Sequence, residues 1–426
     1  MNKPIIGFAG LTHLGIISSI VIAARGFDVI GFHDDTKLIS KINSASFPVK
    51  EPQLIDLYNE NKERITFTAD VTEFSKCHIV YISVDIPTNE NGESDLNPIH
   101  KIINQVLIVL KADACLVILS QVPPGFTRQI ALDKRRLFYQ VETLIFGRAV
   151  ERAMHPERFI IGCENPEVPL PYPLSMYLKS FGCPILPMRY ESAELAKISI
   201  NICLVASVSA ANVLAEICEH IGADWAEVVP ALRLDQRIGQ YSYLSPGLGI
   251  SGGNLERDLA TVLRLSESYK IDAGTVSAWL ANSHHRKNWP YSSLERMILK
   301  DNPNAAIAVL GLAYKENTHS TKNSPALVLI EQLSACKVTV YDPVVPARAA
   351  GDHVIAASSA LDAANGADAI AIMTPWPEFH GLTAGNLAQH MAGRVVIDPY
   401  RVLNGKELRA KGFTYATLGA PLKGLC

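Results

Sequence analysis

A glycine-containing turn near the N-terminus has the spacing of a phosphate-binding loop. Residues 10–15 read GLTHLG, directly after the apolar run IIGFA and at the start of a helix-like pattern. In the template G-x-G-x-x-G, the middle glycine lets the backbone approach a pyrophosphate at the helix N-terminus. Gly10 and Gly15 are in place, whereas Thr12 occupies the middle position, where its Cβ would crowd a phosphate and its hydroxyl could donate a hydrogen bond instead. On its own, the same pattern also fits a strand-to-helix turn that binds no ligand.

In such a fold, an acidic residue about 20 positions further on ends the second strand and holds the adenosine ribose. Here the run DVIGF is followed by His33, Asp34 and Asp35. Alternation along a strand does not decide which of the three points at the crevice. Either carboxylate could hold the ribose, while a lone histidine at this place is more often a loop residue.

Lys197 and Asn201 stand four residues apart in ELAKISIN, so they share one face of a helix. Such a pair is usually part of a solvated face, and its role depends on the surrounding motifs. No metal site is expected, because the eight cysteines form no C-x-x-C pair and lack zinc spacing. Most of them lie in apolar runs, which is typical of reduced thiols in a cytoplasmic protein; their positions are 77, 115, 163, 183, 203, 218, 336 and 426.

The elements that would hold these residues alternate between strand and helix patterns. Apolar runs such as DVIGFHD, CHIVYISV and CLVILSQV alternate with amphipathic helices, which indicates parallel βαβ units. The same order returns in AAIAVLGLAY, SPALVLIEQLSAC, KVTVYDP, DAIAIMTPW and RVVIDPY. We therefore predict an α/β fold with two Rossmann-like doubly wound domains, residues 1–190 and 286–426, joined by a long central helix and helical segment, residues 191–285.

The central segment opens with an unusually long helical pattern. The run from Glu191 to Gly222 keeps helical periodicity for about 30 residues, against a usual ~11–12. It should end at Gly222, since glycine is favoured just after a helix. A helix of this length, apolar on more than one face, usually bridges two domains and packs against its twin, which predicts a homodimer.

Composition narrows the classes of partner. The 426 residues carry a formal net charge of −3 without a basic or acidic block, so nucleic acid and an anionic membrane are not expected as partners. A long uncharged stretch, residues 198–215, contains polar side chains and falls short of the ~20 apolar residues of a membrane span. A helix buried between domains or subunits is the better interpretation.

A series of segments in register resembles the UDP-glucose/GDP-mannose dehydrogenase family over nearly the whole chain. These are GLTHLG, RGFDVIGFHDD, KEPQL, DIPTNENGESDL, SQVPPGFTR, ELAKISIN, LDQRIGQYSYLSPGLG, LERDL, LGLAYKENTHSTKNSPAL, VTVYDP, MTPWPEF and GFTYATLG. The resemblance implies an N-terminal NAD-binding domain, a central dimerisation domain and a C-terminal nucleotide-sugar-binding domain, with the active site in the cleft between them.

Members of that family oxidise the sugar C6 alcohol to a carboxylate with two NAD. A cysteine captures the intermediate aldehyde, and the resulting thioester is hydrolysed. Here the corresponding loop reads GLGISGGNLERDL, two residues longer than the family's. Counting from either end places Asn254 or Gly252 at the cysteine position, so no thiol is expected there.

The resemblance implies catalytic roles for five residues. Lys197 and Asn201 aim at the reacting oxygen, with the lysine stabilising developing negative charge. Asp258 polarises a water or orients the lysine, and Glu142 is a candidate base for water. Asn254 occupies the cysteine position. A second family glutamate is replaced by Phe146, and a threonine by Gln121.

The remaining site assignments also follow from the family's motifs. The cofactor-binding residues are expected to be Gly10, Thr12, Leu14, Gly15, Asp34, Asp35, Pro87, Ser120, Lys315 and Lys322. The substrate-binding residues are expected to be Arg237, Tyr243 and Gly249.

The function predicted from all this is an NAD-dependent oxidoreductase acting on the CH–OH group of a nucleotide-linked sugar, without the cysteine thioester. The alternative is a non-catalytic protein on the same fold that binds a nucleotide sugar or NAD. A dehydrogenase of small hydroxy acids fits less well, because such enzymes usually end in a helical domain rather than in a second dinucleotide-like unit.

Overall fold

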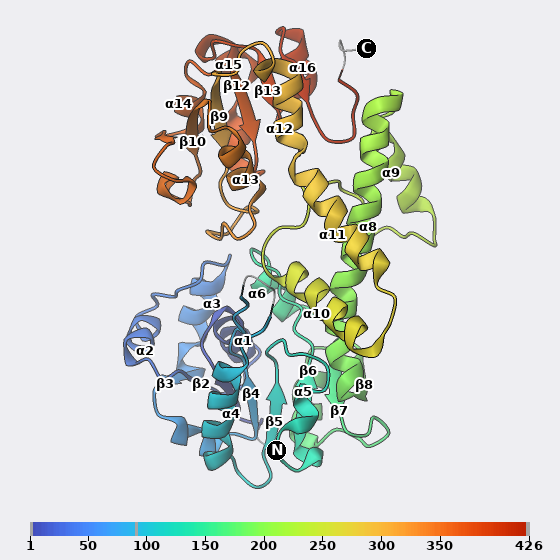
Figure 1. The fold of residues 1–426 in the computed structure, drawn as a ribbon. Coiled ribbons are helices and arrows are strands. Elements are labelled where there is room, and N and C mark those ends of the chain that lie inside the picture. Colours follow the sequence, from blue (N-terminus) through green and yellow to red (C-terminus); the bar gives the residue numbers. More distant parts are fainter. Residues whose placement is uncertain (1–2, 90–92, 423–426) are drawn as a thin grey trace. The chain divides into compact units, whose positions relative to one another are not determined.

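The structure, a computed structural model, describes residues 3–89 and 93–422 and divides into two compact units, residues 1–200 and 201–426. Each unit is built on one sheet (Figure 1). The predicted α/β fold with two Rossmann-like sheets is confirmed. The division into three domains, at residues 190 and 285, stays a prediction.

The strands of the first unit form one sheet in the order β3-β2-β1-β4-β5-β6-β7-β8. Their bounds are β1 Ile6–Ala9, β2 Val29–Phe32, β3 Ile65–Thr68, β4 Ile79–Ile82, β5 Cys115–Ile118, β6 Leu137–Gln140, β7 Phe159–Cys163 and β8 Ile185–Arg189. Neighbouring strands are parallel except for the antiparallel pair β6 and β7. The first six have the strand order of dinucleotide-binding folds, so the topological switch point lies between β1 and β4.

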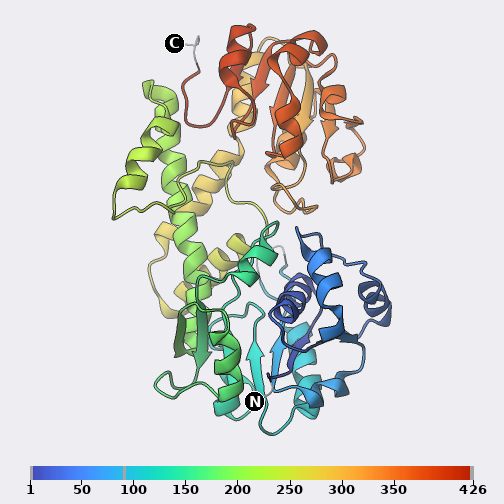
Figure 2. The same cartoon turned by 180° about the vertical axis from the view of Figure 1, so that it is seen from behind.

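Helices cover both faces of this sheet (Figures 1 and 2). Their bounds are α1 His13–Ala24, α2 Thr36–Asn43, α3 Leu54–Asn61, α4 Asn97–Val109, α5 Phe126–Gln129, α6 Ala149–Met154 and α7 Tyr172–Lys179. Side chains alternate along the buried strands: Phe8 and Tyr81 share a core with α1 and α7, whereas Ala9 and Ile82 share one with α4. Burial on both faces explains why these strands appear in the sequence as unbroken apolar runs.

The second unit repeats the same topology. Its strands are β9 Ala306–Leu310, β10 Lys337–Tyr341, β11 Ile355–Ala356, β12 Ala369–Ile372, β13 Val395–Ile397 and β14 Thr414–Ala416. They are all parallel, in the order β11-β10-β9-β12-β13-β14. Two sequences without detectable repetition thus form sheets with the same switch point.

Further helices belong to the second unit. They are α9 Trp225–Leu234, α10 Asn254–Tyr269, α11 Gly274–Lys287, α12 Trp289–Leu294, α13 Pro325–Gln332, α14 Ala360–Ala364, α15 Ala384–His390 and α16 Gly405–Ala410. Helix α13 begins at a Ser-Pro pair, and the Ser324 hydroxyl accepts a hydrogen bond from the Ala326 N–H.

The long helix α8 spans Tyr190–Ile221, 32 residues, which confirms the predicted helix. Gly222 follows with φ 85°, a left-handed conformation that glycine adopts without strain. By length and composition α8 could also cross a membrane. In its most apolar stretch of 18 residues, 33% is buried. A helix at a subunit interface has the same properties, so length and composition alone do not identify what covers it.

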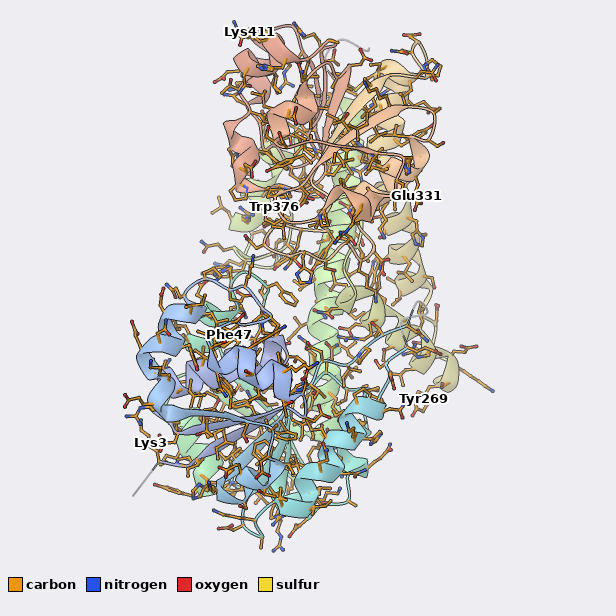
Figure 3. All side chains as sticks on the ribbon, turned by 90° about the vertical axis from the view of Figure 1, so that its left-hand side faces the viewer. Lys3, Phe47, Tyr269, Glu331, Trp376 and Lys411 are labelled. Atoms are coloured by element: carbon orange, nitrogen blue, oxygen red, sulfur yellow. The ribbon has the colours of Figure 1, made fainter. Side chains whose placement is uncertain are left out.

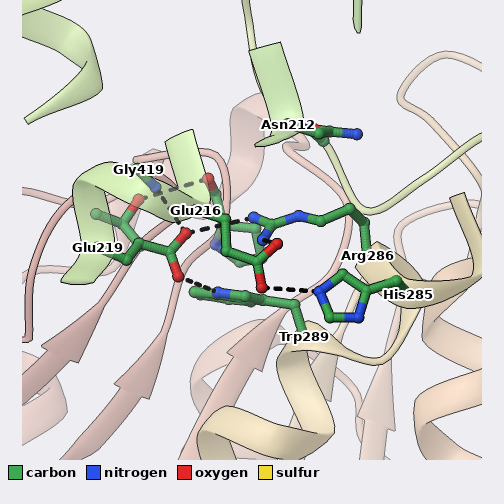
Figure 4. A network of polar contacts seen from close by, with 10 residues as sticks. Asn212, Glu216, Glu219, His285, Arg286, Trp289 and Gly419 are labelled. Atoms are coloured by element: carbon green, nitrogen blue, oxygen red, sulfur yellow. Dashed lines mark hydrogen bonds and ion pairs between the residues drawn. The ribbon is translucent and has the colours of Figure 1, made fainter. Parts of the chain in front are cut away.

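A buried ion-pair network connects α8 with α11 inside the second unit (Figure 4). The Arg286 guanidinium is fully buried and lies 2.9 Å from Glu216 and 3.3 Å from Glu219. Glu219 also accepts hydrogen bonds from the Trp289 indole at 2.8 Å and from the Gly419 N–H at 3.0 Å. Two carboxylates from α8 thereby neutralise one buried cation of α11 and bind the C-terminal segment.

Seven of the eight cysteines lie in the described part of the chain, and all seven are free thiols; Cys426 lies outside it. Cys77, Cys115, Cys163 and Cys218 are buried, whereas Cys203 on α8 is exposed. Burial raises the pKa of Cys77 to about 12 and that of Cys115 to about 11. These two thiols therefore stay protonated near neutral pH and are poor nucleophiles.

Candidate active site

The turn between β1 and α1 requires both of its glycines. Gly10 has φ 105°, and a Cβ there would lie 2.4 Å from the Val84 side chain beyond β4. A Cβ on Gly15 would lie 1.9 Å from the Gly10 carbonyl oxygen. Gly10 therefore allows the turn, and Gly15 allows α1 to pack closely against it.

Thr12 is the N-cap residue of α1, but its hydroxyl does not cap the helix. Instead it donates to the backbone oxygen of Ser83 at 3.1 Å, while the Ser83 hydroxyl donates to the Gly10 oxygen at 2.8 Å. Thr12 therefore holds the turn against the end of β4. The first turn of α1 receives no side-chain cap and is able to accept an anionic group.

The corresponding turn of the second unit is closed by a side chain. Asp342, which follows β10, accepts hydrogen bonds from the Leu312 and Ala313 N–H groups at 2.7 and 3.0 Å. It also accepts one from the indole of Trp376, labelled in Figure 3, at 3.0 Å. A carboxylate thus takes up these N–H groups, whereas the first turn of α1 receives no side-chain cap.

The acidic residues after β2 both have protein partners. Asp35 caps α2 by accepting from the Lys37 and Leu38 N–H groups. Asp34 pairs with Lys101 at 2.6 Å, and this hydrogen bond lowers the pKa of its carboxyl. His33 stands directly after the strand, and its Nδ1 accepts from the Asp35 N–H at 3.0 Å. A ribose at the end of β2 would therefore meet carboxylates that are already engaged.

Ser120, Leu14 and Pro87 lie around the same switch point. The buried Ser120 hydroxyl donates to the Val84 oxygen at 2.6 Å, which ties the end of β5 to the segment after β4. Leu14 is buried in the first turn of α1. Pro87 is exposed in the segment after β4.

Lys197 and Glu142 form an ion pair within the first unit. The Lys197 ammonium donates to the Glu142 backbone oxygen at 2.8 Å and lies 3.4 Å from its carboxylate. The two side chains are only 13% and 20% exposed. The Glu142 carboxylate also accepts a short hydrogen bond from the Leu144 N–H. The backbone of the segment after β6 therefore fixes both partners.

Asn201 and Asp258 form the second pair, within the other unit. The Asn201 amide donates to an Asp258 carboxylate oxygen at 2.5 Å. Asp258 is buried on α10, and its other oxygen lies 3.5 Å from the Arg257 guanidinium. Asp258 is thus a held carboxylate rather than an exposed helix-end charge.

The loop before α10, where the sequence predicts no cysteine, is held by its neighbours. Gly249 has φ 80°, and a Cβ there would lie 2.4 Å from the Ser283 oxygen on α11. Gly252 donates its N–H to the Lys322 oxygen at 3.0 Å, and the Lys322 side chain lies beside Gly253. Asn254 is exposed at the start of α10. The structure thus brings Lys322 to this loop within the second unit.

Two of the residues predicted to bind substrate or cofactor, Arg237 and Tyr243, are exposed, and a third, Lys315, is half-buried. The Arg237 side chain is 89% exposed and pairs with Asp235 at 2.7 Å. Tyr243 is 51% exposed. Lys315 lies near its neighbour Tyr314, with its ammonium 5.8 Å from the ring centroid. None of these three residues takes part in the Lys197–Glu142 or Asn201–Asp258 pair. Their roles in binding substrate or cofactor stay predictions.

Two buried carboxylates near the turn and α8 had no predicted role. Glu51 accepts from the Gly147 and Ala149 N–H groups at 2.8 and 3.1 Å. Glu194, fully buried on α8, accepts from the Gly125 and Thr127 N–H groups at 2.5 and 2.9 Å. Glu51 lies in the motif KEPQL and Glu194 in the motif ELAKISIN. Their place in these motifs is the sequence signal from which a role could be predicted.

Three family models match successive parts of the chain. Residues 5–170 match the NAD binding domain of the UDP-glucose/GDP-mannose dehydrogenase family, residues 191–284 its central domain and residues 308–405 its UDP binding domain. A UDP-glucose 6-dehydrogenase from Rickettsia bellii is 28% identical over 433 residues, which cover 98% of this chain and 100% of the relative. UDP-glucose 6-dehydrogenase TuaD from Bacillus subtilis is 28% identical over 433 residues, covering 98% and 93%.

Solved structures agree over the whole length. A UDP-D-ManNAc dehydrogenase from Pyrococcus horikoshii has a TM-score of 0.83 at 25% identity, covering 97% of this chain and 99% of that one. A UDP-glucose dehydrogenase from Pyrobaculum islandicum has the same TM-score of 0.83 at 24% identity, covers 96% of both chains and supports the fold. The chain therefore belongs to the UDP-glucose/GDP-mannose dehydrogenase family, an oxidoreductase family of nucleotide sugars, and carries its NAD-binding domain.

Proposed function

We propose that the protein is a cytoplasmic, NAD-dependent oxidoreductase that oxidises the CH–OH group of a nucleotide-linked sugar without forming a cysteine thioester. The observation that carries this proposal is the pairing of Lys197 with Glu142 and of Asn201 with Asp258. Lys197 and Asn201 stand four residues apart on one continuous helix, so a substrate oxygen beside that face would meet both.

Both side chains keep hydrogen-bond donors for such an oxygen. An ammonium has three N–H donors, and within the described residues Lys197 directs its hydrogen bonds to Glu142, at the backbone oxygen and the carboxylate. The Asn201 amide has two donors, one of which goes to Asp258. A held ammonium beside an amide is the arrangement that stabilises negative charge developing on an oxygen.

NAD supplies the hydride acceptor when it is bound. The chain's own residues must then orient the alcohol and receive its proton. Glu142 and Asp258 are the carboxylates paired with the two donors, and either can accept that proton through a water. Residues 245–258 contain no cysteine, so this loop offers no thiol to capture an aldehyde. Oxidation is therefore proposed to proceed without a thioester: the alcohol loses a hydride and a proton to give the aldehyde. A second oxidation requires that water first adds to the aldehyde, so that the hydrate loses the second hydride and proton.

The same loop favours the second candidate function, a protein that binds NAD and a nucleotide sugar without turnover. In that case the pairs around Lys197 and Asn201 would serve stability only. The lengthened loop, with either Asn254 or Gly252 at the cysteine position, is the feature that supports it.

One experiment separates the two functions. The full chain is incubated with NAD and a panel of UDP- and GDP-linked sugars, and NADH is followed by absorbance. We expect NADH with at least one sugar, at one or two equivalents per sugar oxidised. Thermal stabilisation by NAD and by a nucleotide sugar without any NADH would favour the binding protein. A sugar adduct in intact-mass spectra during turnover would contradict the thioester-free route.

The assembly proposed is a homodimer that packs along α8. Large apolar side chains of this helix remain exposed in the single chain: Val213, Leu214 and Ile217 at 46% each and Ile221 at 71%. Arg237, exposed and paired with Asp235 in this chain, is proposed to reach the partner's substrate.

A further inference from the structure

A single buried carboxylate joins three segments of the first unit that lie far apart in the sequence. Glu51 precedes α3, and its side chain has no exposed surface. Its Oε1 lies 2.9 Å from His13 Nε2 at the start of α1 and accepts from the Gly147 N–H at 2.8 Å, whereas its Oε2 accepts from the Ala149 N–H at 3.1 Å. Glu51 thereby connects the turn between β1 and α1 to the segment that follows β6.

Helix α6 is held along α1 at both of its ends. At its start, Glu51 accepts from the Ala149 N–H. At its end, the Arg25 guanidinium, at the C-terminal end of α1, donates to the Met154 backbone oxygen. Between these contacts, Ala149 and Val150 share a core with apolar side chains of α1 and α3. The position of α6 therefore follows that of α1.

The segment between β6 and α6 carries Glu142, which pairs with Lys197. The Arg152 guanidinium of α6 donates to the Thr143 backbone oxygen of this segment at 2.8 Å. A cavity of about 60 Å³ is lined by residues 140–144 and by side chains of α1 and α7, and it has room for several water molecules. Because the segment is not close-packed on that side, its hydrogen bonds to α6 and to Glu51 decide where it lies.

We propose that Glu51 is a positioning residue that couples NAD binding to the placement of Glu142. When NAD binds at the uncapped first turn of α1, the start of that helix is ordered, and the Glu51 carboxylate transmits this order through the Gly147 and Ala149 N–H groups. Because its side chain has no exposed surface, Glu51 contacts neither ligand itself. The coupling requires only the NAD-binding domain; the use made of a well-placed Glu142 rests on the proposed function.

Hydrogen–deuterium exchange of the full chain, with and without NAD, tests this coupling without requiring turnover. In the wild type, NAD should slow exchange in the peptide covering residues 143–149 by about fivefold or more, the lower end of the usual coupling between two sites. Glu51→Gln leaves one acceptor oxygen for the two N–H groups that the carboxylate now binds. This variant should still bind NAD in calorimetry, but the protection of residues 143–149 should be lost.

Two further variants keep the test decisive. Gly147→Ala strains the same connection without removing the carboxylate, because Gly147 has φ 84°, and it should also weaken the protection. Asp398→Asn is the matched control, since Asp398 is a buried carboxylate of the second unit that accepts from the Val402 and Leu403 N–H groups. It should retain the protection of residues 143–149. Protection that is absent in a wild type that binds NAD, or unchanged in both first-unit variants, would overturn the proposal.

A kinetic measurement separates positioning from stability once NADH formation from a nucleotide sugar is observed. Glu51→Gln should lower kcat by about 10–10², the usual cost of a misplaced catalytic group, and change the KM for NAD by less than about threefold. An unchanged kcat in this variant would contradict the positioning role. A wild type that shows the NAD-dependent protection but forms no NADH would contradict the proposed function and support the coupling, whereas NADH formation without the protection would contradict the coupling alone.

Discussion

Lys197 is the side chain on which the proposed chemistry depends most. Replacing it with alanine removes the ammonium that faces Glu142 and leaves that carboxylate without its ion pair. We expect Lys197→Ala to lower kcat by about 10²–10³, the usual loss for one oxyanion donor. The change is measured as NADH formation under saturating substrates. Asn254→Ala, at the exposed start of α10, is the matched control and should lose little. Full activity of the Lys197 variant would remove the main argument for an enzyme.

A substitution at Thr12 measures how much NAD affinity is lost because the turn lacks its middle glycine. Thr12→Gly removes the Cβ at the turn together with the hydrogen bond to the Ser83 oxygen. We expect NAD to bind more tightly and the free energy of unfolding to fall by about 0.5–1.5 kcal/mol, the net value of one hydrogen bond. Calorimetry and urea unfolding measure the two effects separately. Thr12→Ser keeps the hydroxyl and should leave the stability nearly unchanged; an unchanged or weaker NAD affinity in the glycine variant would show that the steric argument is wrong.

The sequence predicts a site residue where a local motif contains it. It does not predict a residue whose place depends on a contact with a distant part of the chain. Motifs indicated Lys197, Glu142, Asn201 and Asp258, and the structure pairs them two by two. Glu51 reaches His13 from 38 positions away, and no local pattern specifies that approach. For the same reason, the sequence does not decide which of His33, Asp34 and Asp35 points at the crevice. Helix capping and ion pairs with distant residues determine where each side chain lies.

Glu194 connects α8 to the short helix α5, and its carboxyl makes this connection depend on pH. Burial raises its pKa above the ordinary 4.5, although the Gly125 and Thr127 N–H groups act in the opposite direction. Its contribution to stability is therefore complete below pH 4.5 and is lost as the pH rises through the raised pKa. Glu194→Gln should cost about 1–3 kcal/mol near pH 5, and the difference from wild type should shrink towards pH 8.

Urea unfolding at several pH values measures this trend. The control is Glu191→Gln, one turn earlier on α8, whose ion pair with Arg128 is 41% exposed on both sides. That pair should be worth less than about 1 kcal/mol. A destabilisation by Glu194→Gln that grows with pH would contradict a raised pKa for this carboxyl.

Arg286 holds α11 to the C-terminal part of α8. Arg286→Leu would leave Glu216 and Glu219 buried or half-buried without their cation, at a cost of about 3–5 kcal/mol. Thermal and urea unfolding would detect this loss. His285→Ala also removes a partner of Glu216, but that histidine is 62% exposed, so the change should stay within about 0.5 kcal/mol. Equal effects of the two substitutions would show that the buried charge is not what stabilises this contact.

Elements were more predictable than contacts because periodicity is a local property. The runs around β1, β2, β4 and β5 and the pattern of α8 contain their own signal, an unbroken apolar run or a repeat of 3.6 residues. Strand β8 is only partly buried, and its sequence ILPMR has no such signal. It was not predicted, and it forms because β7 pairs with it over five residues.

At the scale of the whole molecule, the resemblance to a family indicated both sheets and their common order, but a single sequence does not show what covers α8. Leu214, Ile217 and Ile221 follow a helical spacing on one side and stay exposed. We predict that the wild type sediments as a dimer of its 46.4 kDa chain at micromolar concentration. Leu214→Glu together with Ile217→Glu should shift it to monomer, since two buried charges would then oppose association.

The control for this prediction is Ile108→Glu on α4, which introduces the same charge at a side chain that is 85% exposed. That variant should remain a dimer. A wild type that sediments only as monomer would remove the proposed interface, and with it the argument that Arg237 reaches a partner's substrate.

A second outcome would assign the apolar side of α8 to a membrane, which its length and composition also allow. In that case the wild type floats with lipid vesicles and the double variant does not. The two outcomes exclude each other, because the same side chains cannot be covered by a second chain and by lipid at once.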